Sequence, residues 1–146
     1  LRLTELEKGA VNVVIQPGQW PLPRVDHLGL VLDEDELDEA VERARERNLR
    51  VQEHGGRRMF VSTNAGYRLE IHPPREWIDE LLARSDELRL SELHLKADDP
   101  AGKARALADV LGLRCDGAEV ELGETLVRFV GGGPQGRPEL FGELFV

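Results

Sequence analysis

The chain has 146 residues, an apolar fraction of 40% and a formal net charge of −9, which suffices for one sizeable core or two small fused modules. The net negative charge argues against a nucleic-acid partner, because a protein that binds nucleic acid needs a basic face. The sequence has no run of about 18 apolar residues, so we do not expect a membrane partner. The single cysteine, Cys115, cannot form an internal disulfide and no signal peptide is recognisable, so we expect a cytoplasmic protein.

The first 23 residues are expected to form a hairpin and a proline-rich loop. Val11, Val13 and Ile15 alternate along the second strand of this hairpin. A first unit then begins near residue 24 with a strand that carries His27. The spacing of apolar residues predicts a helix over about residues 35–48.

Three β-like segments complete the first unit. The last of them has Glu70 at its centre and ends at Pro73-Pro74, because proline cannot continue a ladder. A linker helix is predicted over about residues 75–84. We therefore expect the boundaries 1–23 for the hairpin and loop, 24–84 for the first unit with its linker, and 85–146 for a second unit.

The second unit repeats this order. A strand with His94 is followed by a helix that we expect to begin at Pro100 and to end at Gly112. Strands are predicted over 120–122, 126–130 and 140–146, and the last has Glu143 at its centre. Each unit is then strand, helix, strand, strand, strand, which predicts an internal repeat with His27 equivalent to His94 and Glu70 equivalent to Glu143.

Side-chain alternation places the ionisable residues away from the helices. Leu28 and Leu30 share the face that a helix would cover, so His27 points the other way. The same alternation frees His94 and both glutamates from the helix-covered faces. The expected fold class is α+β, with a curved, cup-shaped mixed sheet, helices on its outer face and a polar interior.

A single histidine in such a strand is more often structural than a metal ligand, but a matched histidine and glutamate in each unit favours metal binding. We interpret His72, beside Pro73-Pro74, as a rim residue, and rank Glu139 well below Glu143. Arg58 and Arg68 are candidate contacts for an anionic substrate. The alternative is that these arginines pair with surface carboxylates.

Several short motifs in this order resemble the vicinal oxygen chelate superfamily, which includes glyoxalase I, extradiol dioxygenases and bleomycin-resistance proteins. The motifs are Asp26-His27-Leu28-Gly29-Leu30, Tyr67-Arg68-Leu69-Glu70-Ile71, Leu93-His94-Leu95 and Gly142-Glu143-Leu144. The resemblance covers about residues 24–146 and implies two βαβββ modules that form a cup around one divalent metal. The first unit resembles modules that usually come second, so whether the units pair within one chain or across two stays open.

The resemblance implies a metal held by His27, Glu70, His94 and Glu143, with Glu70 and Glu143 also catalytic. Two imidazoles and two carboxylates suit Zn, Ni, Co, Fe(II) or Mn. The implied function is a lyase or isomerase that acts through an enediolate, or a dioxygenase, on a small substrate with vicinal oxygens. The alternative is a metal-free module of the same fold that binds a small molecule. We expect a homodimer, because an unprotected sheet edge invites association.

Overall fold

The computed structural model describes residues 4–8, 11–15, 25–83, 90–133, 135 and 139–145, but not the side chains of residues 4–15, 81, 82 and 139–145. Two antiparallel strands, β1 (Thr4–Lys8) and β2 (Val11–Ile15), form the expected N-terminal hairpin. Among the described strands they pair with one another, so the expected role of the hairpin in covering a sheet edge stays a prediction.

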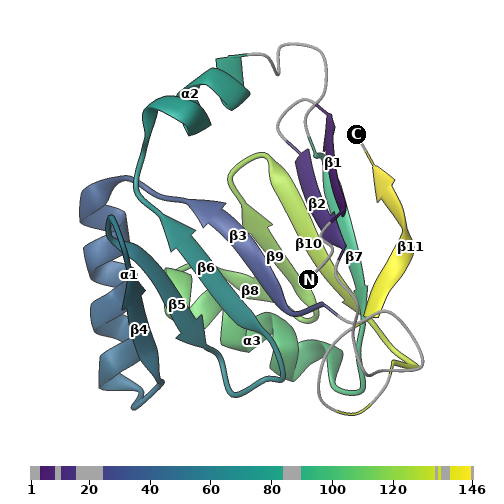
Figure 1. The fold of residues 1–146 in the computed structure, drawn as a ribbon. Helices are drawn as coiled ribbons and strands as arrows, with labels where there is room; N and C mark the ends of the chain where they lie inside the picture. The colour runs from purple at the N-terminus through teal and green to yellow at the C-terminus, as the bar shows by residue number, and fades with distance from the viewer. Residues whose placement is uncertain are drawn as a thin grey trace.

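The first unit is a βαβββ module (Figure 1). Its elements are β3 (His27–Val31), α1 (Glu34–Glu46), β4 (Val51–His54), β5 (Arg58–Ser62) and β6 (Arg68–His72). The sheet order is β3-β6-β5-β4, with β3 parallel to β6 and the other pairs antiparallel. A capping box of Asp33 and Glu36 begins α1, because these groups satisfy backbone N–H groups that the first turn leaves unpaired.

The second unit contains the same module and one strand more. Its elements are β7 (Glu92–Lys96), α3 (Pro100–Leu111), β8 (Cys115–Asp116), β9 (Glu119–Leu122), β10 (Thr125–Val130) and β11 (Glu139–Phe145). The sheet order is β11-β7-β10-β9-β8. The helix starts as expected with Pro100 in its first turn and ends at Gly112, whose φ of 70° is the left-handed conformation that glycine adopts without strain.

Backbone hydrogen bonds show which strands of the two units correspond. In both units the first strand runs parallel to the strand that closes the module, β3 to β6 and β7 to β10. The backbone hydrogen bonds at the two ends of each parallel pair are also the same. In the first unit, Arg68 N donates to Asp26 O and Leu32 N donates to His72 O. In the second unit, Leu126 N donates to Ser91 O and Ala97 N donates to Val130 O. The closing strand of the second module is therefore β10, and β11 is an addition.

This register corrects one prediction. His27 corresponds to Glu92 rather than to His94, and Glu70 corresponds to Arg128 on β10 rather than to Glu143 on β11. The expected equivalence was wrong because β8 has two residues, too few for any periodicity. The sequence therefore predicted β9, β10 and β11 as the three strands after the helix, whereas in the module these three strands are β8, β9 and β10.

The two units share one hydrophobic core, and the α+β class with two βαβββ modules is confirmed. Helices α1 and α3 pack against each other, and Arg43 on α1 donates from Nε to Val110 O at 3.0 Å. Tyr67 in the first unit donates its buried hydroxyl to Lys103 O on α3 at 2.9 Å. The core contains Leu37, Ala40, Val61, Leu69, Ile71, Leu95, Leu107, Val127 and Phe129.

A short helix, α2 (Glu76–Ala83), follows β6 and lies at the position expected for the linker helix. Ile78 on α2 is buried, whereas Trp77 is half exposed. Within the part of the chain that the structure describes, no helix is long and apolar enough to cross a membrane.

Candidate functional site

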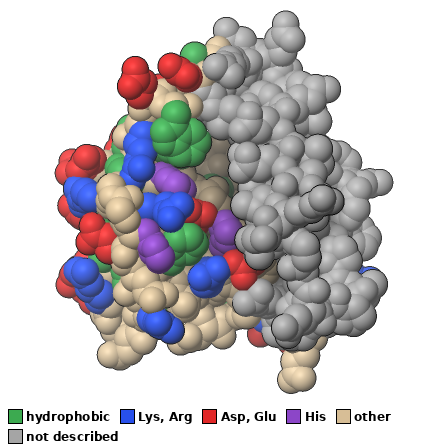
Figure 2. All heavy atoms as spheres, viewed as in Figure 1, with side chains coloured by type: hydrophobic (Ala, Val, Ile, Leu, Met, Phe, Trp, Pro, Cys, Tyr) green, Lys and Arg blue, Asp and Glu red, His purple; other side chains and the backbone are tan. Residues whose placement is uncertain are grey.

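One face of the β3-β6-β5-β4 sheet carries a group of charged side chains. Met59, Val61, Leu69 and Ile71 are buried on the helix-covered face, so the alternate residues of β5 and β6 lie on the other face. We define the polar cluster as Asp26, His27, Arg58, Arg68, Glu70 and His72. Figure 2 shows histidine, arginine and carboxylate side chains gathered on this face beside apolar ones.

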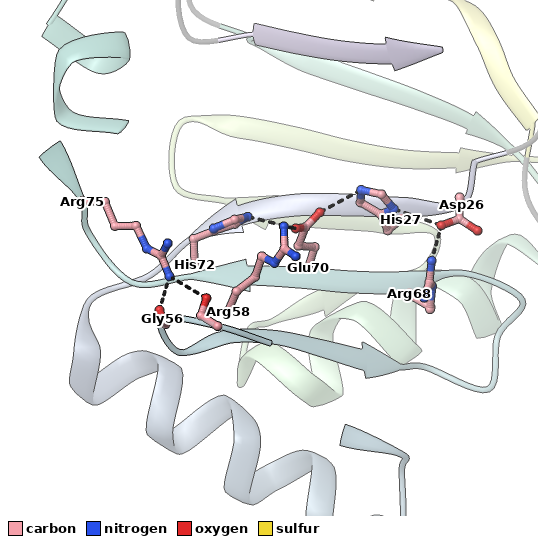
Figure 3. A network of polar contacts seen from close by, with 9 residues as sticks. Asp26, His27, Gly56, Arg58, Arg68, Glu70, His72 and Arg75 are labelled. Atoms are coloured by element: carbon pink, nitrogen blue, oxygen red, sulfur yellow. Dashed lines mark hydrogen bonds and ion pairs between the residues drawn. The ribbon is translucent and has the colours of Figure 1, made fainter. Parts of the chain in front are cut away.

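Glu70 lies at the centre of the polar cluster, and its side chain is only 12% exposed. Its Oε2 lies 2.8 Å from His27 Nε2. Its Oε1 lies 3.2 Å from His72 Nε2 and 3.3 Å from Arg58 NH1. Figure 3 shows the carboxylate between the two imidazoles. Strands β3, β5 and β6 thus bring three nitrogen-bearing side chains to one carboxylate.

His27 has a carboxylate at each ring nitrogen. Nδ1 lies 3.0 Å from Asp26 Oδ2, and Nε2 lies 2.8 Å from Glu70 Oε2. A neutral imidazole carries one N–H and one lone pair, so it can donate to only one of these oxygens. The two contacts are therefore satisfied only if the site holds a second proton, on the imidazole or on one of the two carboxyl groups, or a cation between Nε2 and Glu70.

Asp26 is held in turn by Arg68, whose NH2 group makes an ion pair with Asp26 Oδ2 (Figure 3). The backbone repeats this contact, because Arg68 N donates to Asp26 O. Asp26 is thereby fixed beside the ring of His27. A carboxylate in that position sets the orientation and the tautomer of the imidazole.

His72 contacts Glu70 through Nε2, and its Nδ1 is buried with no hydrogen-bond partner among the described residues. Its ring lies edge-on to Trp77, with the centroids 6.0 Å apart. Burial lowers the pKa of His72; the Glu70 carboxylate opposes this shift, while Arg75 and Arg58 add to it. The buried ring thus favours the neutral form, in which Nε2 or Nδ1 keeps a lone pair.

Phe60 forms the apolar floor of the polar cluster, since it pairs with Glu70 across β5 and β6. The guanidinium groups of Arg58 and Arg68 lie 5.5 Å and 5.0 Å from the centre of its ring. His27 lies edge-on to the same ring at 5.7 Å. Such contacts between a cation and a ring favour the positions of both guanidinium groups beside Phe60.

Among the residues that the structure describes, none closes the side of Glu70 toward β3. The partner of Glu70 in the β3–β6 register is Gly29, and a Cβ added to Gly29 would have no atom of the described residues within 4 Å. Next to the cluster lies a pocket of about 250 Å³, lined by Asp26, Ser62, Asn64, Gly66, Tyr67 and Arg68. A small molecule can therefore reach Glu70 over Gly29.

The predicted site residues divide into two groups. His27, Glu70, Arg58 and Arg68 lie together, as described above. His94 lies on β7 in the other sheet, where its Nε2 contacts Glu92 Oε2 at 2.7 Å. Glu143 belongs to β11, but its side chain lies outside the described residues. The metal-ligand roles of His94 and Glu143 stay predictions.

His72 was interpreted as a rim residue, yet it contacts the central carboxylate. The available signal was its parity, because His72 and Glu70 are two residues apart on one strand. In the second unit the residue that corresponds to Glu70 is Arg128, whose Nε donates to Glu119 at 2.7 Å. The position at the centre of the cluster is therefore acidic in one module and basic in the other.

The chemistry of the cluster can be compared with that of metal sites. Among the residues that the structure describes, no three His, Cys, Asp or Glu side chains are already arranged so that they could hold a metal ion. Searches for relatives add no assignment: no family model matches the chain, and no curated protein and no solved structure matches it either.

Proposed function

We propose that this protein is a glyoxalase-like, metal-dependent enzyme that acts on a small substrate with oxygens on adjacent carbons, as a lyase or isomerase or as a dioxygenase. The first module would hold the divalent metal through His27 and Glu70, with His72 as a third donor. When bound, the metal would act as a Lewis acid toward the two substrate oxygens.

One observation carries this proposal, the position of His27 between two carboxylates. A divalent cation held by His27 Nε2 and Glu70 would remove the need for a second proton, and the proton of the imidazole would then stay on Nδ1 and be donated to Asp26. This arrangement of carboxylate, histidine and metal recurs at protein metal sites, where the outer carboxylate orients the ring.

The donor types also fit. Two imidazole nitrogens and one carboxylate suit Zn, Ni, Co, Fe(II) or Mn, and this set leaves coordination positions for a substrate. His27 and His72 touch different oxygens of Glu70, so side-chain rotations must bring their Nε2 atoms to one point. His94 and Glu143 stay the predicted contribution of the second unit.

The residues around Glu70 would orient the substrate and accept a proton from it. Glu70 has open space above Gly29 and can accept a proton from a substrate carbon or hydroxyl placed there. Arg58, which lies 3.3 Å from Oε1, stabilises the carboxylate until it takes up that proton.

A specific observation favours a second candidate function, metal-free binding of a small molecule. Arg58 and His72 both contact Oε1 of Glu70, so the carboxylate is already balanced by protein groups. In that case a second proton in the site, on the imidazole or on a carboxyl group, rather than a metal, satisfies the two contacts of His27.

Metal analysis of protein purified without a histidine tag separates the two candidates. We expect close to one equivalent of a transition metal in the native protein and a loss of that metal in His27→Ala. His54→Ala is the matched control, because His54 contacts Phe60 at the edge of the face rather than Glu70. Native protein that binds none of Zn, Co, Ni, Mn and Fe(II) in equilibrium dialysis would establish the metal-free candidate instead.

We further propose that the protein is a cytoplasmic homodimer. Within the described strands, β3 is the end strand of its sheet, and Val31 on it is an exposed large apolar residue. An end strand of this kind offers unpaired backbone groups to a second chain.

A further inference from the structure

We propose that the ligand of the polar cluster is a small 2-oxo or 2-hydroxy carboxylate, whose carboxylate group is held by Arg58 and Arg68 above the ring of Phe60. The part of this proposal that concerns the oxygen on the neighbouring carbon rests on the proposed function, because a metal at His27 and Glu70 would bind that oxygen. The binding of the carboxylate group does not depend on the metal.

The charges on this face call for an anion. In the polar cluster, Arg58 and Arg68 pair with Glu70 and Asp26. Arg75 lies beside the cluster and donates to Gly56 O instead of to either carboxylate (Figure 3). The residues labelled in Figure 3 therefore include one more arginine than carboxylate, whereas the chain as a whole has a formal charge of −9.

Both carboxylates of the polar cluster already accept from more than one donor. Glu70 accepts from His27, His72 and Arg58, and Asp26 accepts from His27 and Arg68. Among the described residues, Arg58 Nε and Arg68 Nε are buried without a hydrogen-bond partner. Buried donors of this kind are costly, and a further acceptor at this face would relieve that cost.

The geometry of the arginines favours a planar acceptor. Both guanidinium groups lie against Phe60, at 5.5 Å and 5.0 Å from the ring centre, and each uses one terminal nitrogen for a carboxylate of the cluster, Arg58 NH1 for Glu70 and Arg68 NH2 for Asp26. The other terminal nitrogen of each arginine takes no part in these two ion pairs. A planar guanidinium edge matches the two oxygens of a carboxylate. Lysine, which is a point charge on a flexible stem, would not match them as well.

The space beside the cluster limits the size of the ligand. Gly29 leaves the area over Glu70 open, and the neighbouring pocket, of which Arg68 and Asp26 form a wall, has about 250 Å³. Arg68 and Gly29 lie on the neighbouring strands β6 and β3 but two residues apart in the register, so their Cα atoms are about 8 Å apart. Polar contacts at the two ends cover part of this distance, so a ligand with three or four bonded atoms in a chain, as in a 2-oxo acid, can reach from one to the other.

Pyruvate and its neutral amide, pyruvamide, are the probes. Each is titrated into the full chain in the presence of EDTA and followed by NMR of the backbone amides. We expect pyruvate to shift the amides of β5 and β6 and pyruvamide to bind at least tenfold more weakly. Arg68→Gln and Arg58→Gln should each weaken pyruvate binding at least tenfold, whereas Arg45→Gln, the same change on an exposed part of α1, should leave it unchanged.

The wild-type comparison needs no variant and keeps the test decisive if an arginine variant unfolds. Equal binding of pyruvate and pyruvamide, or pyruvate binding that survives in folded Arg58→Gln and Arg68→Gln, would overturn the proposal. The metal analysis described above is separate: arginine-dependent pyruvate binding by a protein that takes up no metal would retain this inference and reject the proposed enzyme.

Discussion

Replacing Gly29 with valine should separate stability from ligand binding. A Cβ at this position meets no atom within 4 Å in the described part of the chain, and Gly29 has no positive φ that would strain a valine. Valine is also favoured in strands. Glycine, in contrast, loses more conformational entropy on folding than any other residue. We therefore expect the free energy of unfolding to stay within about 1 kcal/mol of wild type, and strand propensity alone favours an increase.

Ligand binding should respond in the opposite way. Gly29 pairs with Glu70, so the two valine methyl groups would occupy the open space over the carboxylate. A ligand that needs this space loses its contact with Glu70, and we expect at least tenfold weaker pyruvate binding, which corresponds to about 1.4 kcal/mol.

Urea denaturation and the pyruvate titration measure the two quantities on the same samples. Gly131→Val is the control, since Gly131 in the second unit also has open space and no positive φ. A Gly29→Val protein that unfolds with several kcal/mol less free energy would show that the sheet face is packed here. One that binds pyruvate like the wild type would show that ligands do not pass over Gly29.

Three further predictions concern the pH dependence, the contact between the units and the assembly. His72 has a lowered pKa in the folded protein, so at a pH just below the ordinary histidine pKa of about 6.5 the unfolded chain binds more protons than the folded chain. The free energy of unfolding should therefore fall as the pH falls through this range. His72→Gln should reduce the dependence of this free energy on pH, as measured by urea denaturation at several pH values. Tyr67→Phe removes the hydroxyl bond to Lys103 O and should lower the free energy of unfolding by about 1 kcal/mol, while an unchanged value would mean that this bond adds nothing between the units. Sedimentation equilibrium should show a dimer that Val31→Lys dissociates, since a charge blunts an end strand; a wild-type monomer at micromolar concentration would contradict this.

Local patterns in the sequence predicted most of the fold. Apolar spacing located α1 and α3, and Pro100 and Gly112 marked the ends of α3. Strand parity placed His27 and Glu70 on a common face, and they are in contact. These features depend on periodicity over several residues or on the conformational limits of proline and glycine, which sequence alone reveals.

Features that depend on pairing between distant strands were not predictable in the same way. The register of β7 against β10 makes Arg128 the counterpart of Glu70, and no local pattern distinguishes β10 from β11 as the closing strand. The contact of His72 with Glu70 was missed because Pro73-Pro74 suggested the end of the site, whereas the backbone of β6 remains paired with β3 as far as His72.

Titration with Co(II), which reports its ligands through its visible absorption, tests most directly whether the first module builds the metal centre. The account predicts that wild-type protein binds about one Co(II), that His27→Ala and His72→Ala each lose this binding, and that His54→Ala keeps it. The role of the second unit is read from His94→Ala in the same experiment, as a change in the spectrum if His94 is a ligand. Co(II) binding that is unchanged in both His27→Ala and His72→Ala would contradict a centre built around Glu70.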